Sequence, residues 1–162
     1  MSYGAATVPG VPHDRALFGA AVYGVLTDPV GRVLLIRRAG SGYRDGQLSL
    51  PAGHLDGGED AVEGLRRELR EEIGVEVDRG ACRLALMLHR AKELPDDPEY
   101  IDFVFAISRW DGDPVIGEPE KCSELVWADP EDLPGDVADY IVESLKAIRD
   151  GEPLLLLGWD RS

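Results

Sequence analysis

Three glutamates near the middle of the chain have a spacing that could hold a divalent metal ion. Glu71 and Glu72 follow Glu68 by three and four residues, and residues so spaced share one helix face, with Cβ atoms about 5–6 Å apart. Carboxylates at so short a distance repel one another unless a cation lies among them. Their hard oxygen atoms suit magnesium, manganese or calcium. The alternative is a solvated acidic face balanced by the interspersed arginines, since surface pairs of this kind contribute little.

The segment before these glutamates favours the metal site. Residues 50–59 have the sequence LPAGHLDGGE, which is dense in glycine and leads directly into the acidic stretch. Glycine permits close approach of the backbone to a ligand and unusual φ angles. A carbonyl group of this loop could therefore add a ligand to the carboxylates.

Loop and glutamates together resemble the signature sequence of the Nudix hydrolases. Gly53 is followed after five residues by Glu59, and after seven more by residues 67–75, which read RELREEIGV. Every fixed position of that pattern is matched, including the aliphatic positions Leu69 and Val75. The family's fold implies an α+β protein, a three-layer α/β/α sandwich with a mixed β-sheet, as a single domain over residues 1–162.

Weaker similarities extend over most of the chain, from the strand near Leu17 to the helix ending near Arg149. Trp127 and the following Leu-Pro pair at 133–134 resemble residues that family members carry before the last helix. Residues 118–122, EPEKC, resemble a motif of MutT-like nucleotide hydrolases.

The resemblance also implies roles for individual residues. Glu68, Glu71 and Glu72 would ligate Mg²⁺, with Mn²⁺ as a substitute, and the Gly53 carbonyl would be a further ligand. Glu68 or Glu72 would orient or deprotonate the attacking water. Arg67 would pair with one of these carboxylates and fix its rotamer.

Residues around the signature sequence would complete the site. Glu59 would brace the loop against the helix. A carboxylate outside the signature often completes the metal site in this family, and Glu118 and Glu120 are the candidates, with Asp113 behind them. For each of these three, a plain surface position is the alternative.

The implied reaction is hydrolysis of a pyrophosphate bond in a nucleoside diphosphate linked to another moiety. A nucleoside triphosphate, including one with an oxidised base, is the favoured substrate and would give the monophosphate and pyrophosphate. ADP-ribose, a dinucleoside polyphosphate and a nucleotide-binding regulatory role are alternatives. An isoprenoid diphosphate isomerase of similar fold would need a catalytic cysteine, and neither Cys82 nor Cys122 has a matching context.

Five further residues are candidates for substrate contact. Arg37 and Arg38 end a predicted strand, where they could meet a phosphate or carry a charge in solvent. Tyr43 could stack on a base, and His54 could touch a phosphate. Asp102 is a polar residue in an apolar strand, so it either faces outward or contacts a base or metal.

Periodicity predicts the elements that must position these residues. Ala61, Leu65, Leu69 and Ile73 recur every four residues and predict a helix, which Gly74 should end. A turn at 28–31 predicts that 32–38 returns as the partner of a strand at 17–27. A short extended piece is expected at 48–52, further strands at 83–90, 100–110 and 124–128, a last helix at 137–149, a loose tail at 1–14, and an apolar tail at 154–159 that packs on the domain or across a dimer.

The amino-acid composition argues against some classes of binding partner. Asp and Glu total 31 against 17 Lys and Arg, a net charge of −14, which repels nucleic acid polymers and membrane surfaces. No apolar run approaches the roughly 20 residues that span a bilayer, and the first residues lack the pattern of a signal peptide. We expect a cytoplasmic monomer or homodimer with two free, buried thiols.

Overall fold

The computed structural model describes residues 9–10, 12 and 15–159, so the loose tail expected at 1–14 lies almost entirely outside the described residues. The elements in chain order are β1 (Phe18–Leu26), β2 (Val33–Arg38), β3 (Leu48–Ser49), β4 (Ala52–His54), α1 (Ala61–Ile73), a 3-10 turn (Arg79–Ala81), β5 (Cys82–Arg90), β6 (Glu99–Ile107), β7 (Cys122–Ala128), α2 (Asp139–Arg149) and β8 (Leu154–Leu157).

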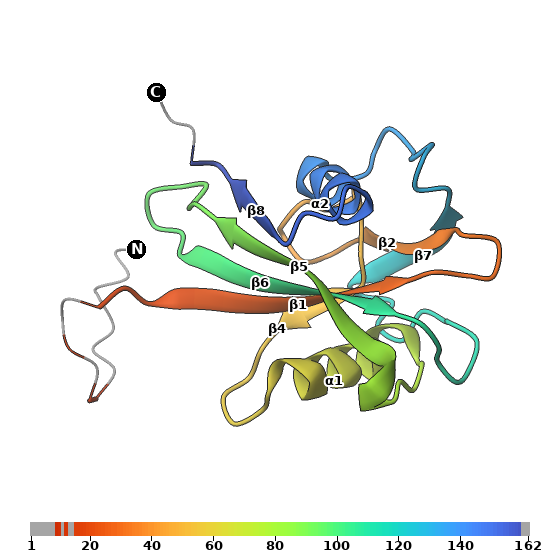
Figure 1. Ribbon diagram of the computed structural model, residues 1–162, viewed down its shortest axis with the longest axis horizontal. Helices are drawn as coiled ribbons and strands as arrows, with labels where there is room; N and C mark the ends of the chain where they lie inside the picture. Colours follow the sequence, from red (N-terminus) through yellow and green to blue (C-terminus); the bar gives the residue numbers. More distant parts are fainter. Residues whose placement is uncertain (1–8, 11, 13–14, 160–162) are drawn as a thin grey trace.

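The described strands form a five-stranded sheet, β4-β1-β6-β5-β8, and a three-stranded sheet, β3-β2-β7. β1 pairs with β6 and β5 with β8 in parallel, and the other neighbours are antiparallel. Helix α1 lies on one side of the sheets and α2 on the other (Figure 1). The α+β class and the mixed sheet predicted from the sequence are confirmed.

One expected strand pairing is wrong. The turn at 28–31 forms, with Gly31 N donating to Asp28 O at 3.0 Å, but only the bridge Thr27–Val33 links the two strands beyond it. β2 pairs instead with β7 and β3. Its residues alternate between the core under α2 and the core under α1. Because β2 is apolar on both faces, it lies between the two cores and not at the edge of a hairpin.

Helix α1 begins and ends where the sequence predicts. Asp60 caps it by accepting hydrogen bonds from Val62 N and Glu63 N, and Gly74 ends it with φ +68°. Its apolar stripe of Leu65, Leu69 and Ile73 is fully buried in the core under α1.

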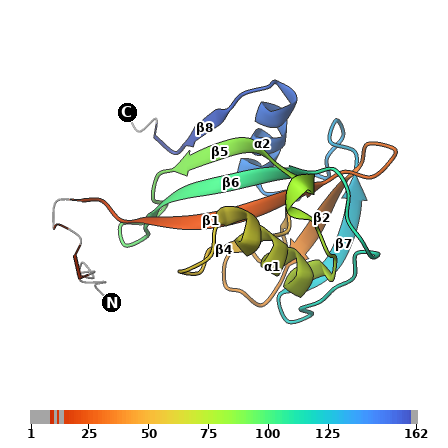
Figure 2. The same ribbon diagram turned by 60° about the horizontal axis from the view of Figure 1, so that its bottom comes forward.

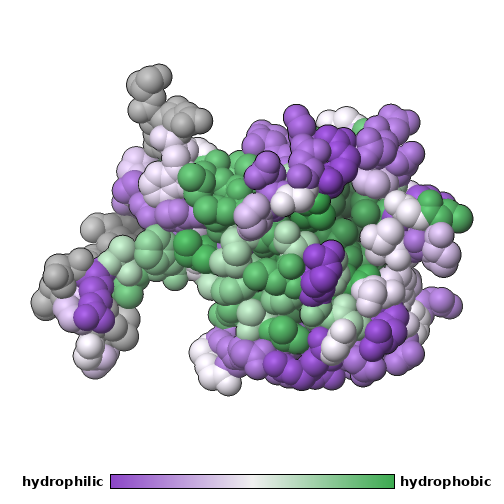
Figure 3. All heavy atoms as spheres, in the orientation of Figure 1, coloured by the Kyte–Doolittle hydropathy of each residue, from purple (hydrophilic) through white to green (hydrophobic). Residues whose placement is uncertain are grey.

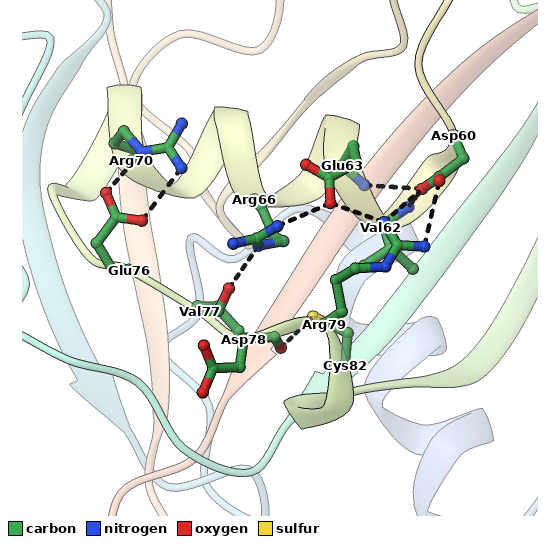
Figure 4. A network of polar contacts seen from close by, with 10 residues as sticks. All are labelled: Asp60, Val62, Glu63, Arg66, Arg70, Glu76, Val77, Asp78, Arg79 and Cys82. Carbon is green, nitrogen blue, oxygen red and sulfur yellow. Dashed lines mark hydrogen bonds and ion pairs between the residues drawn. The ribbon is translucent and has the colours of Figure 1, made fainter.

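Two arginines of α1 are used on its outer side (Figure 4). Arg66 bonds Glu63 at 2.7 Å and the carbonyl of Val77 at 2.6 Å, and Arg70 bonds Glu76 at 2.6 Å. These contacts fasten α1 to the segment that follows it. They also commit both arginines to other partners, so they do not neutralise Glu68 and Glu72.

The apolar tail packs on the domain as strand β8 beside β5 (Figure 2). Leu155 and Leu157 contact the core under α2, whereas Leu154 and Leu156 are 50% and 57% exposed. The face shown in Figure 3 has an apolar area between more polar surfaces.

Two further predictions concern the cysteines and membrane-spanning helices. Both cysteines are free, with Cys122 buried and Cys82 half-buried. Among the described residues, no helix is both long and apolar enough to cross a membrane.

Candidate active site

A cavity of about 670 Å³ lies beside the edge strand β4 and the second half of α1. One part of its wall, which we call the carboxylate end, consists of Gly53, Glu68, Glu72 and Glu118. Gly53 comes from β4, both helix glutamates from α1, and Glu118 from the loop before β7. Residues of the predicted signature segment therefore line this cavity.

Glu68 lies directly against Gly53. A Cβ atom placed on Gly53 would be 2.0 Å from Glu68 Cδ and 2.3–2.4 Å from its two carboxylate oxygens. No side chain can occupy that space while Glu68 stays in place. Glycine at residue 53 therefore lets the Glu68 carboxylate approach the backbone closely. It does not serve an unusual backbone angle, since Gly53 has no positive φ.

Glu72 is the most buried acid of the site, with 7% of its surface exposed. Its Oε2 accepts a hydrogen bond from Ala52 N at 3.1 Å, which satisfies that backbone N–H group of β4. The pKa of Glu72 is raised to about 8, chiefly by burial and also by the charges of Glu68 and Glu118, against the lowering effect of the Ala52 bond. Burial likewise raises the pKa of Glu68, with Arg67 opposing the shift.

Arg67 connects the loop to the glutamates. It donates to Glu68 Oε1 at 2.6 Å, to both carboxylate oxygens of Glu59 at 2.6 and 3.0 Å, and to the carbonyl of His54 at 3.1 Å. Glu59 in turn accepts from Asp56 N at 2.8 Å, and its pKa is lowered to about 2, first by the Arg67 bonds. One guanidinium therefore sets the position of the Glu68 carboxylate relative to the loop.

The other predicted metal ligands are placed less favourably. Glu71 is 48% exposed, lies 3.5 Å from Arg67 and does not line the cavity. Glu120 and Asp113 are also absent from its wall, whereas Glu118 is present and pairs with Lys121 at 3.2 Å. Across residues 15–159, no group of three or more His, Cys, Asp or Glu side chains is arranged closely enough to hold a metal ion as it stands.

The donor chemistry at the carboxylate end nevertheless fits a hard divalent cation. The charges of Glu68, Glu72 and Glu118 act on one another, and Gly53 leaves the Glu68 carboxylate room against the backbone. Oxygen donors of this kind are the ligands that Mg²⁺ prefers.

The structure separates the candidate substrate contacts into two groups. Arg38, Tyr43 and His54 line the cavity. Arg37 does not, because its guanidinium bonds Glu124 at 2.7 Å and Asp136 at 2.6 Å and fastens β2 to its neighbours.

Asp102 corrects a prediction. An outward-facing position is wrong for this residue, since it is 0% exposed, and its Oδ2 accepts a hydrogen bond from Arg90 Nε. Asp102 does not line the cavity, but Arg90 does. The carboxylate is buried because a cation from the neighbouring strand pairs with it.

Several cavity residues were missed by reasoning from the sequence alone. They are Tyr23, Arg90, Glu93, Tyr100, Lys121 and Tyr140. They come from β1, β5, β6, α2 and two loops, so no spacing along the chain brings them together. The one available signal was Asp102, because a carboxylate in an apolar strand indicates a buried cationic partner.

The chain belongs to the NUDIX domain family, whose model matches residues 17–148. As a member it is a hydrolase that acts on pyrophosphate bonds, which are phosphorus-containing acid anhydrides.

Two relatives carry different names. The 8-oxo-dGTP diphosphatase of Escherichia coli strain K12 is 26% identical over 113 residues, covering 68% of this chain and 84% of the relative. The isopentenyl-diphosphate Delta-isomerase 2 of Aromatoleum aromaticum is 30% identical over 128 residues, covering 77% of this chain and 66% of the isomerase.

Solved structures show the same fold. The MutT NUDIX hydrolase from Burkholderia pseudomallei superimposes with a TM-score of 0.72 at 23% identity, covering 80% of this chain and 97% of the other. The MutT protein from Methanosarcina mazei Go1 does so with a TM-score of 0.71 at 22% identity, covering 83% and 95%.

Proposed function

We propose that the chain hydrolyses a pyrophosphate bond in a nucleoside diphosphate linked to another moiety, with Mg²⁺ or Mn²⁺ as cofactor. The favoured substrate is a nucleoside triphosphate, including one with an oxidised base, and the products are the monophosphate and pyrophosphate. The observation that carries this proposal is the packing of the Glu68 carboxylate against Gly53, beside the buried Glu72. The similarity to an 8-oxo-dGTP diphosphatase supports the substrate class.

Residues of the carboxylate end would hold the cation. Glu68, Glu72 and the Gly53 carbonyl are the proposed ligands, with Glu118 beside them and Glu71 at the exposed margin. When bound there, a divalent cation neutralises phosphate charge and lowers the pKa of water.

The chain's own residues supply the other parts of the reaction. Either Glu68 or Glu72 accepts the proton of the attacking water. The water oxygen bonds to phosphorus, and the bridging oxygen leaves with the other product, either pyrophosphate or the nucleoside monophosphate. Glu72 is buried at the carboxylate end, where it is shielded from bulk solvent. Arg67 holds Glu68 in place, and Arg38 lines the cavity, where its charge can meet a phosphate.

A second candidate function comes from the isomerase relative. An isomerase of that kind would use a cysteine in the cavity. In the described part of the chain, neither cysteine lines it: the Cys82 thiol contacts Asp78 O, and Cys122 is buried in the core under α1. This placement disfavours the isomerase.

A substrate panel tests the proposal. Nucleoside triphosphates, an oxidised purine triphosphate, ADP-ribose, a dinucleoside polyphosphate and isopentenyl diphosphate would be incubated with the protein, with and without Mg²⁺, and the products separated by chromatography. We expect Mg²⁺-dependent hydrolysis of at least one nucleotide and no isomerisation. No hydrolysis of any nucleotide would refute the proposed function.

A further inference from the structure

A second part of the cavity wall is aromatic. Tyr23, Tyr100 and Tyr140 line it together with Arg90, and we call these four residues the aromatic end. Strand order separates Arg90 from Gly53, because β1 and β6 lie between β4, which carries Gly53, and β5, which carries Arg90. Tyr100 lies between them, with its hydroxyl 3.4 Å from His54 Nε2. Three strand spacings amount to roughly 14 Å. A ligand whose pyrophosphate lay at the glutamates would extend towards Arg90 with the group beyond its phosphates.

Arg90 is held in one orientation by several contacts. Its Nε donates to the fully buried Asp102, and its Cζ lies 4.6 Å from the ring centroid of Tyr100 and 5.5 Å from that of Tyr140. Only 14% of the Arg90 side chain is exposed. A guanidinium fixed in this way loses little freedom when it binds a ligand.

The Tyr100 ring beneath Arg90 also has a fixed place. Gly19, Tyr100 and Arg90 are direct neighbours across β1, β6 and β5. A Cβ atom on Gly19 would lie 2.4 Å from the Tyr100 ring. The ring therefore covers Gly19, and any larger residue there would push Tyr100 out of its contact with Arg90.

Arg90 keeps unused hydrogen-bond donors. Nε is taken by Asp102, but neither Nη atom donates to an acceptor in the part of the chain that the structure describes. Because Arg90 lines the cavity, these N–H groups are available to a ligand.

We propose that Arg90, oriented by Asp102, is a specificity-determining residue that selects an oxopurine ring over an aminopurine ring. This inference rests on the proposed function for the place of the phosphates. Two neighbouring acceptors, such as N7 and O6 of guanine or hypoxanthine, match the guanidinium edge. Adenine offers a donor at its 6-amino group, which would face the donors of Arg90. Among the surrounding tyrosines, the half-buried Tyr100 has ring surface left for a base, whereas Tyr23 and Tyr140 are only 5% and 8% exposed and belong to the core.

Binding of nucleoside monophosphates tests the inference without requiring turnover. Calorimetric titration with GMP, IMP and AMP in Mg²⁺ would be carried out on the wild type and on Arg90→Gln, Arg90→Lys and Asp102→Asn. We expect GMP and IMP to bind at least about tenfold more tightly than AMP, the size of one bidentate pair. Arg90→Gln should abolish the difference, and Asp102→Asn should reduce it.

Arg83→Gln is the matched control, because Arg83 lies exposed on the same strand and outside the cavity; it should retain the preference. Arg90→Lys keeps the charge beside Asp102, so a loss of preference in that variant cannot be attributed to an unpaired buried acid.

Two results would overturn the inference. The first is equal binding of the three nucleotides by the wild type. The second is a loss of affinity in Arg90→Gln that is the same for all three, since this would assign Arg90 to a phosphate or ribose contact. Both results can be read even if the substrate panel shows no hydrolysis, so failure of the proposed function is recognised separately.

Discussion

Replacing Gly53 with alanine should separate catalysis from folding. The added Cβ would lie 2.0 Å from Glu68 Cδ, at least about 1 Å closer than nonbonded carbon atoms pack. The backbone at residue 53 has no positive φ, so alanine fits the chain itself. The relief must come from Glu68, whose carboxylate is the free end of a flexible side chain. A displacement of about 1 Å at a catalytic group can reduce the rate about 100-fold.

The assay is kcat for the best nucleotide of the substrate panel at saturating Mg²⁺, together with the melting temperature. Gly57→Ala is the matched control, because Gly57 belongs to the same loop and has nothing within 4 Å of an added Cβ. We expect both variants to melt at the wild-type temperature, and we expect kcat to fall only in Gly53→Ala. A Gly53→Ala enzyme with the activity of Gly57→Ala would refute the argument that Glu68 needs this space.

Three other predictions concern stability, binding and pH. Leu69→Ala, at a fully buried position, should lower the free energy of unfolding by about 2–5 kcal/mol in a denaturant titration, and a smaller loss would contradict its core role. Arg38→Gln should raise KM for the nucleotide while Arg37→Gln does not, since only Arg38 lines the cavity; equal effects would count against this assignment. In EDTA, thermal stability should fall as pH rises from about 4.5 towards 8, because folded Glu72 retains a proton that the unfolded chain has released. Glu72→Gln should flatten this dependence, and Mg²⁺ should oppose it.

The bounds of the helix in the signature segment could be predicted closely because the residues that determine them are near one another in the sequence. Asp60, the apolar repeat and Gly74 set its start, face and end within 15 residues. Its position beside Gly53 followed from the family resemblance. The pairing of β2 could not be predicted in the same way, because a turn sets only the reversal of the chain, and the partner depends on which apolar faces must be covered.

The aromatic end shows where sequence reasoning stops. Arg90 and Asp102 are 12 residues apart in the chain and become neighbours only through the register of β5 with β6. Tyr140, which contacts Arg90, belongs to α2 and is 50 residues from Arg90 in the chain, so no local sequence pattern predicts the contact. Arg37 and Arg38 adjoin in sequence, yet a strand directs alternate side chains to opposite faces, so one fastens β2 to its neighbours and the other faces the cavity.

The most direct test of the central claim compares Glu72→Gln with the wild type at saturating Mg²⁺, using the nucleotide that the wild type hydrolyses fastest. Glutamine retains an acceptor for Ala52 N and resembles the protonated carboxyl, so the variant should fold. We predict a loss in kcat of at least about 100-fold, as expected when one preorganised electrostatic group is removed, and a smaller rise in melting temperature on adding Mg²⁺. Full activity in Glu72→Gln, with an unchanged response to Mg²⁺, would contradict the account.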